Sequence, residues 1–444
     1  MRGYTFFLVL CLLIDSAFVY AADNSAATGP LRVWTAEQAV AFAIENNPDS
    51  TIARNRIEQA LATASMAKAV DYPHVIFSTE YGQTNNPIQS FGNILNQGAF
   101  DNNINFNDPG RTDNLQVRAE IKYRLYNGGK DQADQSAASA HIDASKTELI
   151  AIHQQLGFEV VKTFQAIIQA EKMVTVREEA LASIITSLEV GKARFDAGDM
   201  LKQDLLNLEL QQSRASENLI QSNHTLEITK RIFLNLLGLR EGEIMVDASS
   251  GLDQKIPETF DYRNHHEMKK INAAEQAALA ELKKAKGEKL PSVDTFASYQ
   301  IDSGLVLDES GDSWMAGLRM NYVLFDGQRS SSDIIRAKLK LQEIESLRNK
   351  TELALDLQVQ QALLDYEQAK ERISVTEKMV SVAEEVTRLS RARFKEGVIL
   401  VSDLIDLEMR LSDAKARHLA ARAVFQVAIA NLRKTAGLQQ FSTE

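Results

Sequence analysis

The sequence contains two copies of one unit, and this duplication limits the folds that the chain can adopt. A shift of 199 residues places 193–209 on 392–408, and nine of the seventeen aligned positions are identical. Ordinary residue usage would give roughly one match. The same shift aligns two shorter motifs, Tyr123-x-Leu125-x-x-Gly128 and Tyr322-x-Leu324-x-x-Gly327. Because several matches occur in one order, each copy should supply the same structural unit.

The first copy carries an insertion. Pro73 and Tyr123 are 50 residues apart, whereas their counterparts Pro291 and Tyr322 are 31 residues apart. The 19 additional residues fall within 83–112, a stretch that is rich in Asn and Gly and contains two prolines. This composition predicts a long loop between two strands.

One segment of each copy alternates between apolar and polar residues. In 115–125 every odd position is apolar or aromatic and every even position is polar or charged. This is the pattern of a strand with one wet and one apolar face. Both a soluble sheet resting on a core and a membrane-spanning sheet fit it. The predicted strands lie at about 74–82, 113–126, 292–302 and 315–326. Since the smallest closed membrane barrels have about eight strands, a membrane sheet would require several chains to pool theirs.

Long stretches without proline follow the strands. The segments 128–197 and 327–396 are rich in helix-forming residues, and each would span roughly 100 Å as one helix. Each precedes a second predicted helix, 199–238 or 398–437, that ends near a glycine.

The first long helix carries two seams. Small residues recur at spacings of four and three, and large apolar residues recur at a spacing of seven on another face. Two seams predict partners on two sides, as in the wall of a tube. The small residues are Ala133, Ala137, Ala140, Ala144, Thr147 and Ala151, and the large ones are Ile142, Leu149 and Leu156.

The N-terminus and the charge limit the compartment and the partners. Residues 1–21 combine Arg2 with a short apolar stretch and small residues at a cleavage point, so they are predicted to be a signal peptide. Cys11 is the only cysteine, and the bulky Leu10 before it disfavours lipidation. The remaining chain has no thiol, which suits an oxidising compartment. The net charge of −11 argues against a nucleic-acid partner, because phosphates require a basic face.

The sequence shows no catalytic or metal-binding constellation. Its seven histidines lack the spacing of zinc ligands. The pair His265-His266 is interpreted as solvated within a polar connector. The sequence therefore predicts neither an enzyme nor a cofactor or metal site.

Three sets of motifs are similar to those of the TolC-like family of outer-membrane efflux and secretion channels. They are the segment 36–48 (Ala-Glu-Gln-Ala-Val-Ala-x-Ala-x-Glu-Asn-Asn-Pro), the two Arg-Phe-x-x-Gly turns and the two Tyr-x-Leu-Tyr/Phe-Asn/Asp-Gly strand exits. The resemblance implies a mainly α protein with a membrane β-barrel. In such a homotrimer, twelve pooled strands form a barrel in outer-membrane lipid, and the helices continue it as a coiled-coil tunnel in the periplasm of a Gram-negative bacterium.

The resemblance also implies a function and a division of the chain. Such a protein is the passive exit duct of a tripartite efflux or type I secretion system. Its partners are a periplasmic adaptor (membrane fusion) protein and an inner-membrane pump of the RND or ABC type. The expected parts are a signal peptide, a first repeat, an equatorial connector, a second repeat and a tail. Their boundaries are 1–21, 22–239, 240–270, 271–438 and 439–444.

By the same resemblance, the two Arg-Phe-x-x-Gly turns are periplasmic tips that contact the adaptor. The residues assigned to the tips are Phe195, Gly198 and Leu201 in the first copy and Phe394, Gly397 and Leu400 in the second. Asp403 and Asp406 occupy the positions of acidic rings at the closed end of the tunnel, where three copies would attract cations. Asp204 matches Asp403, but Asn207 replaces the second acid.

Alternatives remain open. Aspartates near a helix start also complement the helix dipole without any role in a gate. Some family members latch the tip with an arginine and a tyrosine at positions that are Ile399 and Phe394 here, so the resemblance does not supply the latch of this chain. A soluble periplasmic coiled-coil adaptor or scaffold would also be exported and helical. The strand alternation and the shared 199-residue register favour the channel.

Overall fold

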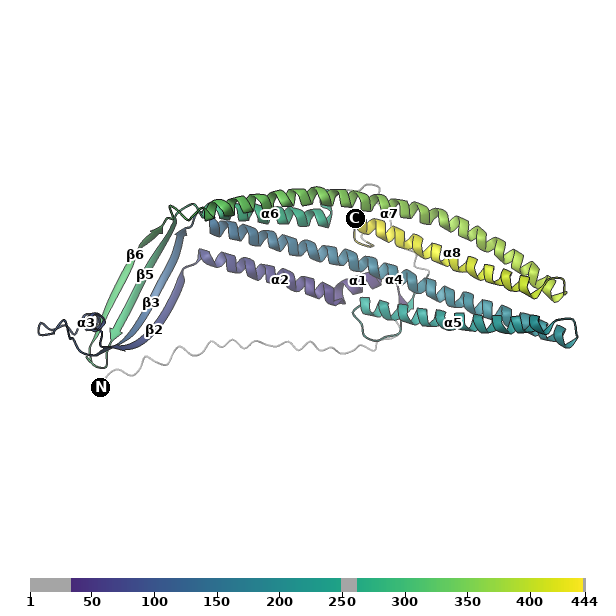
Figure 1. Ribbon diagram of the computed structural model, residues 1–444, viewed down its shortest axis with the longest axis horizontal. Coiled ribbons are helices and arrows are strands. Elements are labelled where there is room, and N and C mark those ends of the chain that lie inside the picture. The colour runs from purple at the N-terminus through teal and green to yellow at the C-terminus, as the bar shows by residue number, and fades with distance from the viewer. Residues whose placement is uncertain (1–32, 249–261, 442–444) are drawn as a thin grey trace.

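The computed structural model describes residues 33–248 and 262–441. The predicted signal peptide and the last residues of the predicted tail lie outside these ranges, as does part of the predicted connector. The chain forms a long rod with a small sheet at one end and a pair of helical turns at the other (Figure 1). Columns of helix join the two ends.

A four-stranded antiparallel sheet occupies the first end. Its strands are β2 (His74–Thr84), β3 (Thr112–Tyr126), β5 (Ser292–Ser303) and β6 (Ser310–Asn321). They lie in the order β2-β3-β5-β6, so each copy supplies one hairpin and the two hairpins join between β3 and β5. The edges of the sheet are β2 and β6, and no other strand of the described ranges pairs with their outer sides.

The last strand lies earlier in the chain than the predicted 315–326. β6 ends at Asn321, which is opposite Ser292, the first residue of β5. Pro291 precedes Ser292 and has no backbone N–H to donate, so β5 offers no further partner. The residues after Asn321 instead form an exposed exit from the sheet, in which Leu324 is 85% exposed.

The sequence had predicted a long loop for the insertion in 83–112, but part of this insertion is helical. It contains α3 (Pro87–Asn96), which contacts β3 and β6. Asn86 caps this helix, because its side chain accepts the N–H of Ile88 at 3.1 Å. Pro87 takes the first helical position, where the missing N–H has no intrahelical partner to lose. The sequence-based prediction missed this helix because the Asn and Gly residues of the segment also favour loops.

Two helices of 67 residues run the length of the rod, α4 (Lys130–Asp196) and α7 (Arg329–Lys395). No residue of the small-residue stripe of α4 is exposed, and Ala133 and Ala140 are only 1% and 6% exposed. Next to the sheet, α4 contacts α2 (Pro48–Lys68) on one side and α6 (His266–Gly287) on the other. The prediction of partners on two sides is therefore confirmed.

The shorter helices form two columns, each made of two helices placed end to end (Figure 1). One column is α2 followed by α5 (Lys202–Leu236), and the other is α6 followed by α8 (Val401–Thr435). Short 3₁₀ turns lie at Ala69–Asp71 and Tyr262–Asn264. In the half away from the sheet, the helices lie side by side in the order α5-α4-α8-α7. α5 and α7 are therefore the edges of this layer.

Asn47 holds the junction between α2 and α5. Its side chain accepts the N–H of Asp49 at 2.8 Å and so caps α2, and its amide donates to the carbonyl of Leu236 at the end of α5, 2.9 Å away. Gly238 follows with φ +77°, and a Cβ on it would lie 2.7 Å from the carbonyl oxygen of Asn46. The close approach of the two helix ends therefore requires glycine.

The main hydrophobic core lies at mid-length, next to this junction. α1 (Ala36–Asn46) packs across α4 there, and β1 (Val33–Trp34) pairs in parallel with β4 (Met245–Val246). Thr35 caps α1 by accepting the N–H of Gln38 at 3.2 Å. The buried core residues are Trp34, Ala36, Ala39, Val40, Ala43, Leu156, Val160, Val161, Phe164, Ile167, Phe233, Leu234, Leu237, Ile244 and Ala430.

Candidate functional site

One face of the sheet is apolar and exposed. The register places Phe77, Ala119, Tyr299 and Trp314 in one row across all four strands, so their side chains share a face. Phe77 and Trp314 are 71% and 77% exposed, and Leu318 on the same face is 71% exposed. A contiguous exposed apolar face of this kind marks a surface for lipid or for another protein.

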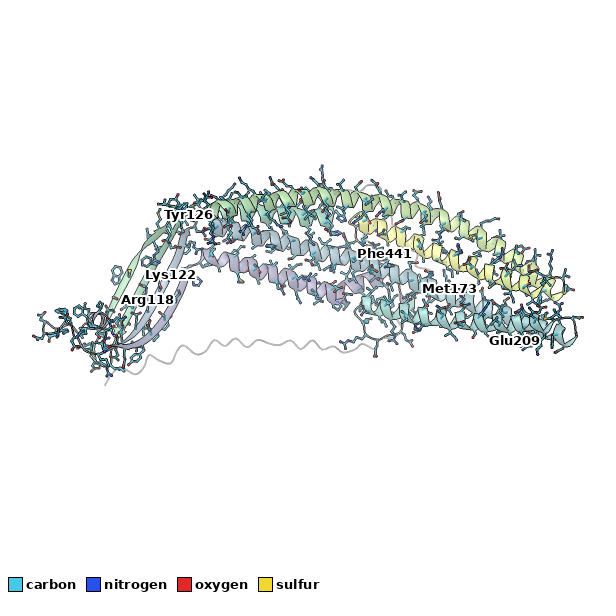
Figure 2. The ribbon with its side chains drawn as sticks, in the orientation of Figure 1. Arg118, Lys122, Tyr126, Met173, Glu209 and Phe441 are labelled. Carbon is cyan, nitrogen blue, oxygen red and sulfur yellow. The ribbon has the colours of Figure 1, made fainter. Side chains whose placement is uncertain are left out.

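The opposite face of the sheet is mostly polar, and β3 contributes polar and charged residues to it. Glu120 lies between two cations on β3, 3.2 Å from the Nζ of Lys122 and 3.8 Å from a guanidinium nitrogen of Arg118. Figure 2 labels Arg118 and Lys122 along this strand. Further along, Arg124 lies 3.5 Å from Asp294 of β5. An apolar face backed by a charged face is the arrangement of a membrane strand that borders a water-filled interior.

The end of α3 is attached to the polar face at the far end of the sheet. Gln97, which is fully buried, donates to the carbonyl of Asp113 at 2.6 Å and to the side chain of Asn114 at 3.1 Å. Asn114 in turn donates to Asp302 at 2.6 Å. A Cβ on Gly311 would lie 2.2 Å from the backbone of α3, so this close contact depends on glycine.

The other end of the rod is formed by two similar glycine turns. Gly198 and Gly397 have φ of +80° and +75°. In each turn the residue after the glycine donates its N–H to an arginine carbonyl, Asp199 to Arg194 at 2.8 Å and Val398 to Arg393 at 2.9 Å. These bonds satisfy the last carbonyls of α4 and α7 in a Schellman motif.

The two turns differ in what they expose. Leu201 and Leu400 are each 68% exposed. Phe195 is 36% exposed, whereas its counterpart Phe394 is only 2% exposed. Phe394 packs with Leu188, Leu208, Val401 and Leu404 in a small core between the two hairpins. The exposed apolar surface of the tip in one chain therefore comes from the leucines, Phe195 and Val398, which is 74% exposed, and not from Phe394.

The three aspartates singled out by the sequence lie close to the turns. Asp204 and Asp403 are in the first turns of α5 and α8, where a carboxylate complements the helix dipole. Asp406 lies beyond the first turn and is 2.8 Å from Arg410 in an exposed ion pair. The dipole thus accounts for the positions of Asp204 and Asp403 but not for that of Asp406.

Arg194 joins the two turns, although the sequence-based assignment did not include it. Its Nη1 donates to the carbonyl of Phe394 at 3.2 Å, and its Nη2 donates to the carbonyl of Asp199 at 3.3 Å. Its Cζ lies 5.6 Å from the centre of the Phe394 ring. Identity with Arg393 in the second copy was the signal that could have found it.

A second polar link between the hairpins lies near the tip. Glu408 of α8 is 7% exposed and accepts hydrogen bonds from Arg391 at 2.5 and 2.7 Å and from Ser183 of α4 at 2.9 Å. The hydrogen bond to Glu408 raises the pKa of Arg391 against the opposing effect of burial. This carboxylate therefore connects all of α4, α7 and α8.

His265 is buried and His266 is half-buried, so the interpretation that the pair is solvated was wrong. His265 is 4% exposed, and its ring lies beside Gly437 at the end of α8. Its Nδ1 accepts the N–H of Glu267 at 3.2 Å and caps α6. Burial, with the nearby His266, lowers the pKa of His265 to about 4. Burial also lowers the pKa of His266.

Neither a metal site nor a membrane helix is found in the described part of the chain. Within 33–248 and 262–441, no three His, Cys, Asp or Glu residues are grouped as metal ligands. None of the helices in these ranges combines the length and the apolar character that crossing a membrane requires.

The sheet with one apolar and one charged face, continued by a rod of long helices, defines a channel-forming protein of the outer membrane. Residues 40–238 and 262–438 match the family described as Outer membrane efflux protein, and the chain belongs to this family. It is an exit duct for efflux or secretion across the outer membrane. The alternative of a soluble adaptor is not supported. The family is one of channels and not of enzymes.

Two named relatives match over most of the chain, and a third matches over about half of it. Nodulation protein T of Rhizobium leguminosarum bv. trifolii is 22% identical over 397 residues, which cover 86% of this chain and 80% of that protein. Protein CyaE of Bordetella pertussis is 22% identical over 90% of this chain and 83% of its own length. Outer membrane efflux protein BepC of Brucella suis is 21% identical over 51% of this chain and 50% of its own.

Solved structures share the fold. The structure of CusC has a TM-score of 0.79 and 16% identity, covering 91% of this chain and 92% of that one. The open state of the Neisseria gonorrhoeae MtrE outer membrane channel has a TM-score of 0.76 and 18% identity, covering 91% and 89%. The likeness confirms the predicted fold class of a helical tunnel joined to barrel strands.

Proposed function

We propose that three copies of this chain form the duct. The observation that carries the proposal is the pair of open edges of the sheet. β2 and β6 have unpaired outer sides within the described ranges, and a four-stranded sheet cannot close on itself. When β6 of each copy pairs with β2 of the next, three copies pool twelve strands with the apolar face toward lipid and the charged face toward the pore.

The oligomer can be tested directly. Outer membranes are extracted with detergent, and the protein is run on a denaturing gel with and without boiling and sized by light scattering coupled to chromatography. We expect three chains per particle and slow migration without boiling. A particle of one chain, or release from the membrane without detergent, contradicts the proposal.

The tip is the proposed docking surface for a periplasmic adaptor, which in turn would connect to an inner-membrane pump. Leu201 and Leu400 are exposed at the two turns, and exposed leucines at the end of a helical hairpin offer an apolar contact to another helical hairpin. The test is cross-linking in cells followed by identification of the captured chain, with Leu201→Glu and Leu400→Glu as variants. We expect both variants to lose capture while the trimer and its membrane location persist.

Asp403 and Asp406 are the proposed acidic collar of the closed tip. Three copies would place six carboxylates around one axis, which attracts cations through the summed field. Asp406 gives the more decisive test of the collar, because the alternative explanation by the helix dipole does not account for its position. Asp406→Asn should lower the preference for cations over anions in planar bilayers, whereas Asp204→Asn in the first copy should change it less. Equal reversal potentials for all three proteins contradict the collar.

A further inference from the structure

The two long helical hairpins of one chain, α4–α5 and α7–α8, have similar sequences but different neighbours. α4 of the first hairpin packs on α8 of the second, and this is the main contact between the two long hairpins within the described ranges, with a smaller one between α5 and α8. α7 and α5 lie at the edges of the layer, and no helix of the described ranges covers their outer sides (Figure 1). The 199-residue repeat maps α4 onto α7 and α8 onto α5, so the two open edges are counterparts of the two packed surfaces.

The open edge of α7 has the composition of a packed surface. We call five of its residues the outer seam, and they follow spacings of four and three. Their exposed fractions are Val375 61%, Met379 41%, Val382 50%, Val386 39% and Leu389 46%. Their counterparts on α4 lie 199 residues earlier, and none of those is exposed. An apolar heptad seam in water indicates a missing partner helix.

The tip shows the same difference between the copies. Phe394 is 2% exposed because Leu188 of α4 and the adjacent turn cover its ring. Phe195 is 36% exposed, since no helix of the described ranges occupies the equivalent place beside it. Arg194 donates to the carbonyl of Phe394. Its counterpart Arg393 lies at the edge of the layer and is the same residue type with the same local turn.

We propose that the outer seam of α7 packs on α5 of a second copy in the register of α4 on α8, and that Arg393 donates to the carbonyl of Phe195 of that copy. This proposal rests on the trimer proposed above and adds its register. The pair formed by Ser183 and Glu408 within a chain, 2.9 Å apart, corresponds to Val382 and Glu209 between chains. Figure 2 places Glu209 on the free edge of α5.

The proposal gives the tip a latch that this chain can make. Arg194 and Arg393 alternate around the six turns of the trimer. The guanidinium of each hairpin donates to a backbone carbonyl of the next hairpin. A backbone carbonyl is available whatever residue occupies the turn, so the latch does not depend on a tyrosine at Phe394 or an arginine at Ile399. The fork of the guanidinium reaches two carbonyls from two different nitrogens, as Arg194 shows, whereas a lysine would have to reach both from a single nitrogen.

The register is tested by cross-linking. Cys11 is the only cysteine and lies in the predicted signal peptide, so introduced thiols are unique. The variant Val382→Cys/Glu209→Cys is treated with a short bis-maleimide in membranes. Both positions are exposed in the single chain, so folding is preserved. The matched control is Val382→Cys/Ser216→Cys, which moves the second thiol two helical turns along the same face of α5.

We expect covalent dimers and trimers from the first pair and few from the control. Every variant is also run on a denaturing gel without boiling, to check that it forms the trimer. A particle that is not a trimer overturns the proposed function itself. A trimer that cross-links through Ser216 and not through Glu209 overturns only the register.

The latch is tested by conductance in planar bilayers. Arg194→Ala and Arg393→Ala each remove hydrogen bonds to carbonyls at the tip, and we expect each to raise the open probability by about ten-fold, with Arg393→Lys in between. Arg388→Ala is the control, because Arg388 is an exposed cation of α7 that pairs with Glu385 in the next turn toward the sheet. An Arg393→Ala trimer that behaves like Arg388→Ala overturns the latch.

Discussion

The junction between α6 and α8 should loosen as the pH falls. His265 caps α6 only while its Nδ1 is free to accept the N–H of Glu267. Burial lowers the pKa of this imidazole to about 4, below the value of 6.5 for an unfolded chain. The open state of the junction therefore binds a proton more readily than the closed state between pH 6.5 and about 4, and closure becomes weaker across that window. Above pH 6.5 the contribution of His265 is complete.

The magnitude follows from the two pKa values. A difference from 6.5 to about 4 corresponds to roughly 3 kcal/mol at ~1.36 kcal/mol per pH unit. His265 also lines an open groove between α4, α7 and α8, so solvent reaches the surroundings of the ring. We therefore expect a loss of on the order of 1–2 kcal/mol in the free energy of opening between pH 7 and pH 4.5.

Hydrogen exchange at the start of α6 measures this free energy locally, so it does not require reversible unfolding of the whole protein. Protection is corrected for the intrinsic pH dependence of exchange. The junction at α2 is an internal control, because Asn47 caps it and does not titrate in this window. His265→Asn keeps a capping oxygen and should abolish the pH dependence, whereas His265→Ala should lower protection by about 1 kcal/mol at pH 7.

Two outcomes refute this reasoning. One is protection at the start of α6 that falls with pH no more than at the start of α2. The other is a His265→Asn variant that retains the full pH dependence, since the titrating group would then lie elsewhere. His266 is the nearest alternative, because it stacks on His265 with ring centres 4.2 Å apart.

Three further predictions follow from burial and backbone geometry. Trp314→Lys should reduce assembly into membranes by on the order of 1–3 kcal/mol, measured as folded yield in lipid vesicles, while Ser313→Lys on the wet face should not. Phe394→Ala should cost about 3–5 kcal/mol and make the turns sensitive to limited proteolysis, whereas Leu201→Ala, at an exposed position, should cost less than about 0.5 kcal/mol. Gly238→Ala should lower the melting temperature more than Gly198→Ala. Both glycines have positive φ, but only the first would bring a Cβ within 2.7 Å of a neighbouring carbonyl oxygen.

The periodic features of the molecule could be predicted from the sequence. The alternation of 115–125 indicated a two-faced strand, and the two seams of α4 indicated contacts on two sides, because both are local patterns that burial imposes on every turn or pleat. The motifs shared with the channel family indicated the fold class, which the structural likeness confirms.

Features that depend on distant neighbours could not be predicted in this way. Phe195 and Phe394 sit in identical motifs, yet only Phe394 is buried, because the order of the hairpins covers one and not the other. His265 looked solvated in a polar connector, and its burial arises from the end of α8, which lies far away in the sequence. The end of β6 was misplaced because Pro291 on the partner strand, not a signal in β6 itself, ends the ladder.

The two kinds of helical column have different mechanical properties. α4 and α7 are continuous for 67 residues, whereas the other two columns are interrupted at mid-length, where Asn47 and His265 cap the next helix. At its midpoint an interrupted column is joined by a few hydrogen bonds and by side-chain packing, whereas a continuous helix has an unbroken backbone ladder over its whole length. A displacement of the turns is therefore transmitted to the sheet through α4 and α7, while the jointed columns can flex at their midpoints and absorb it.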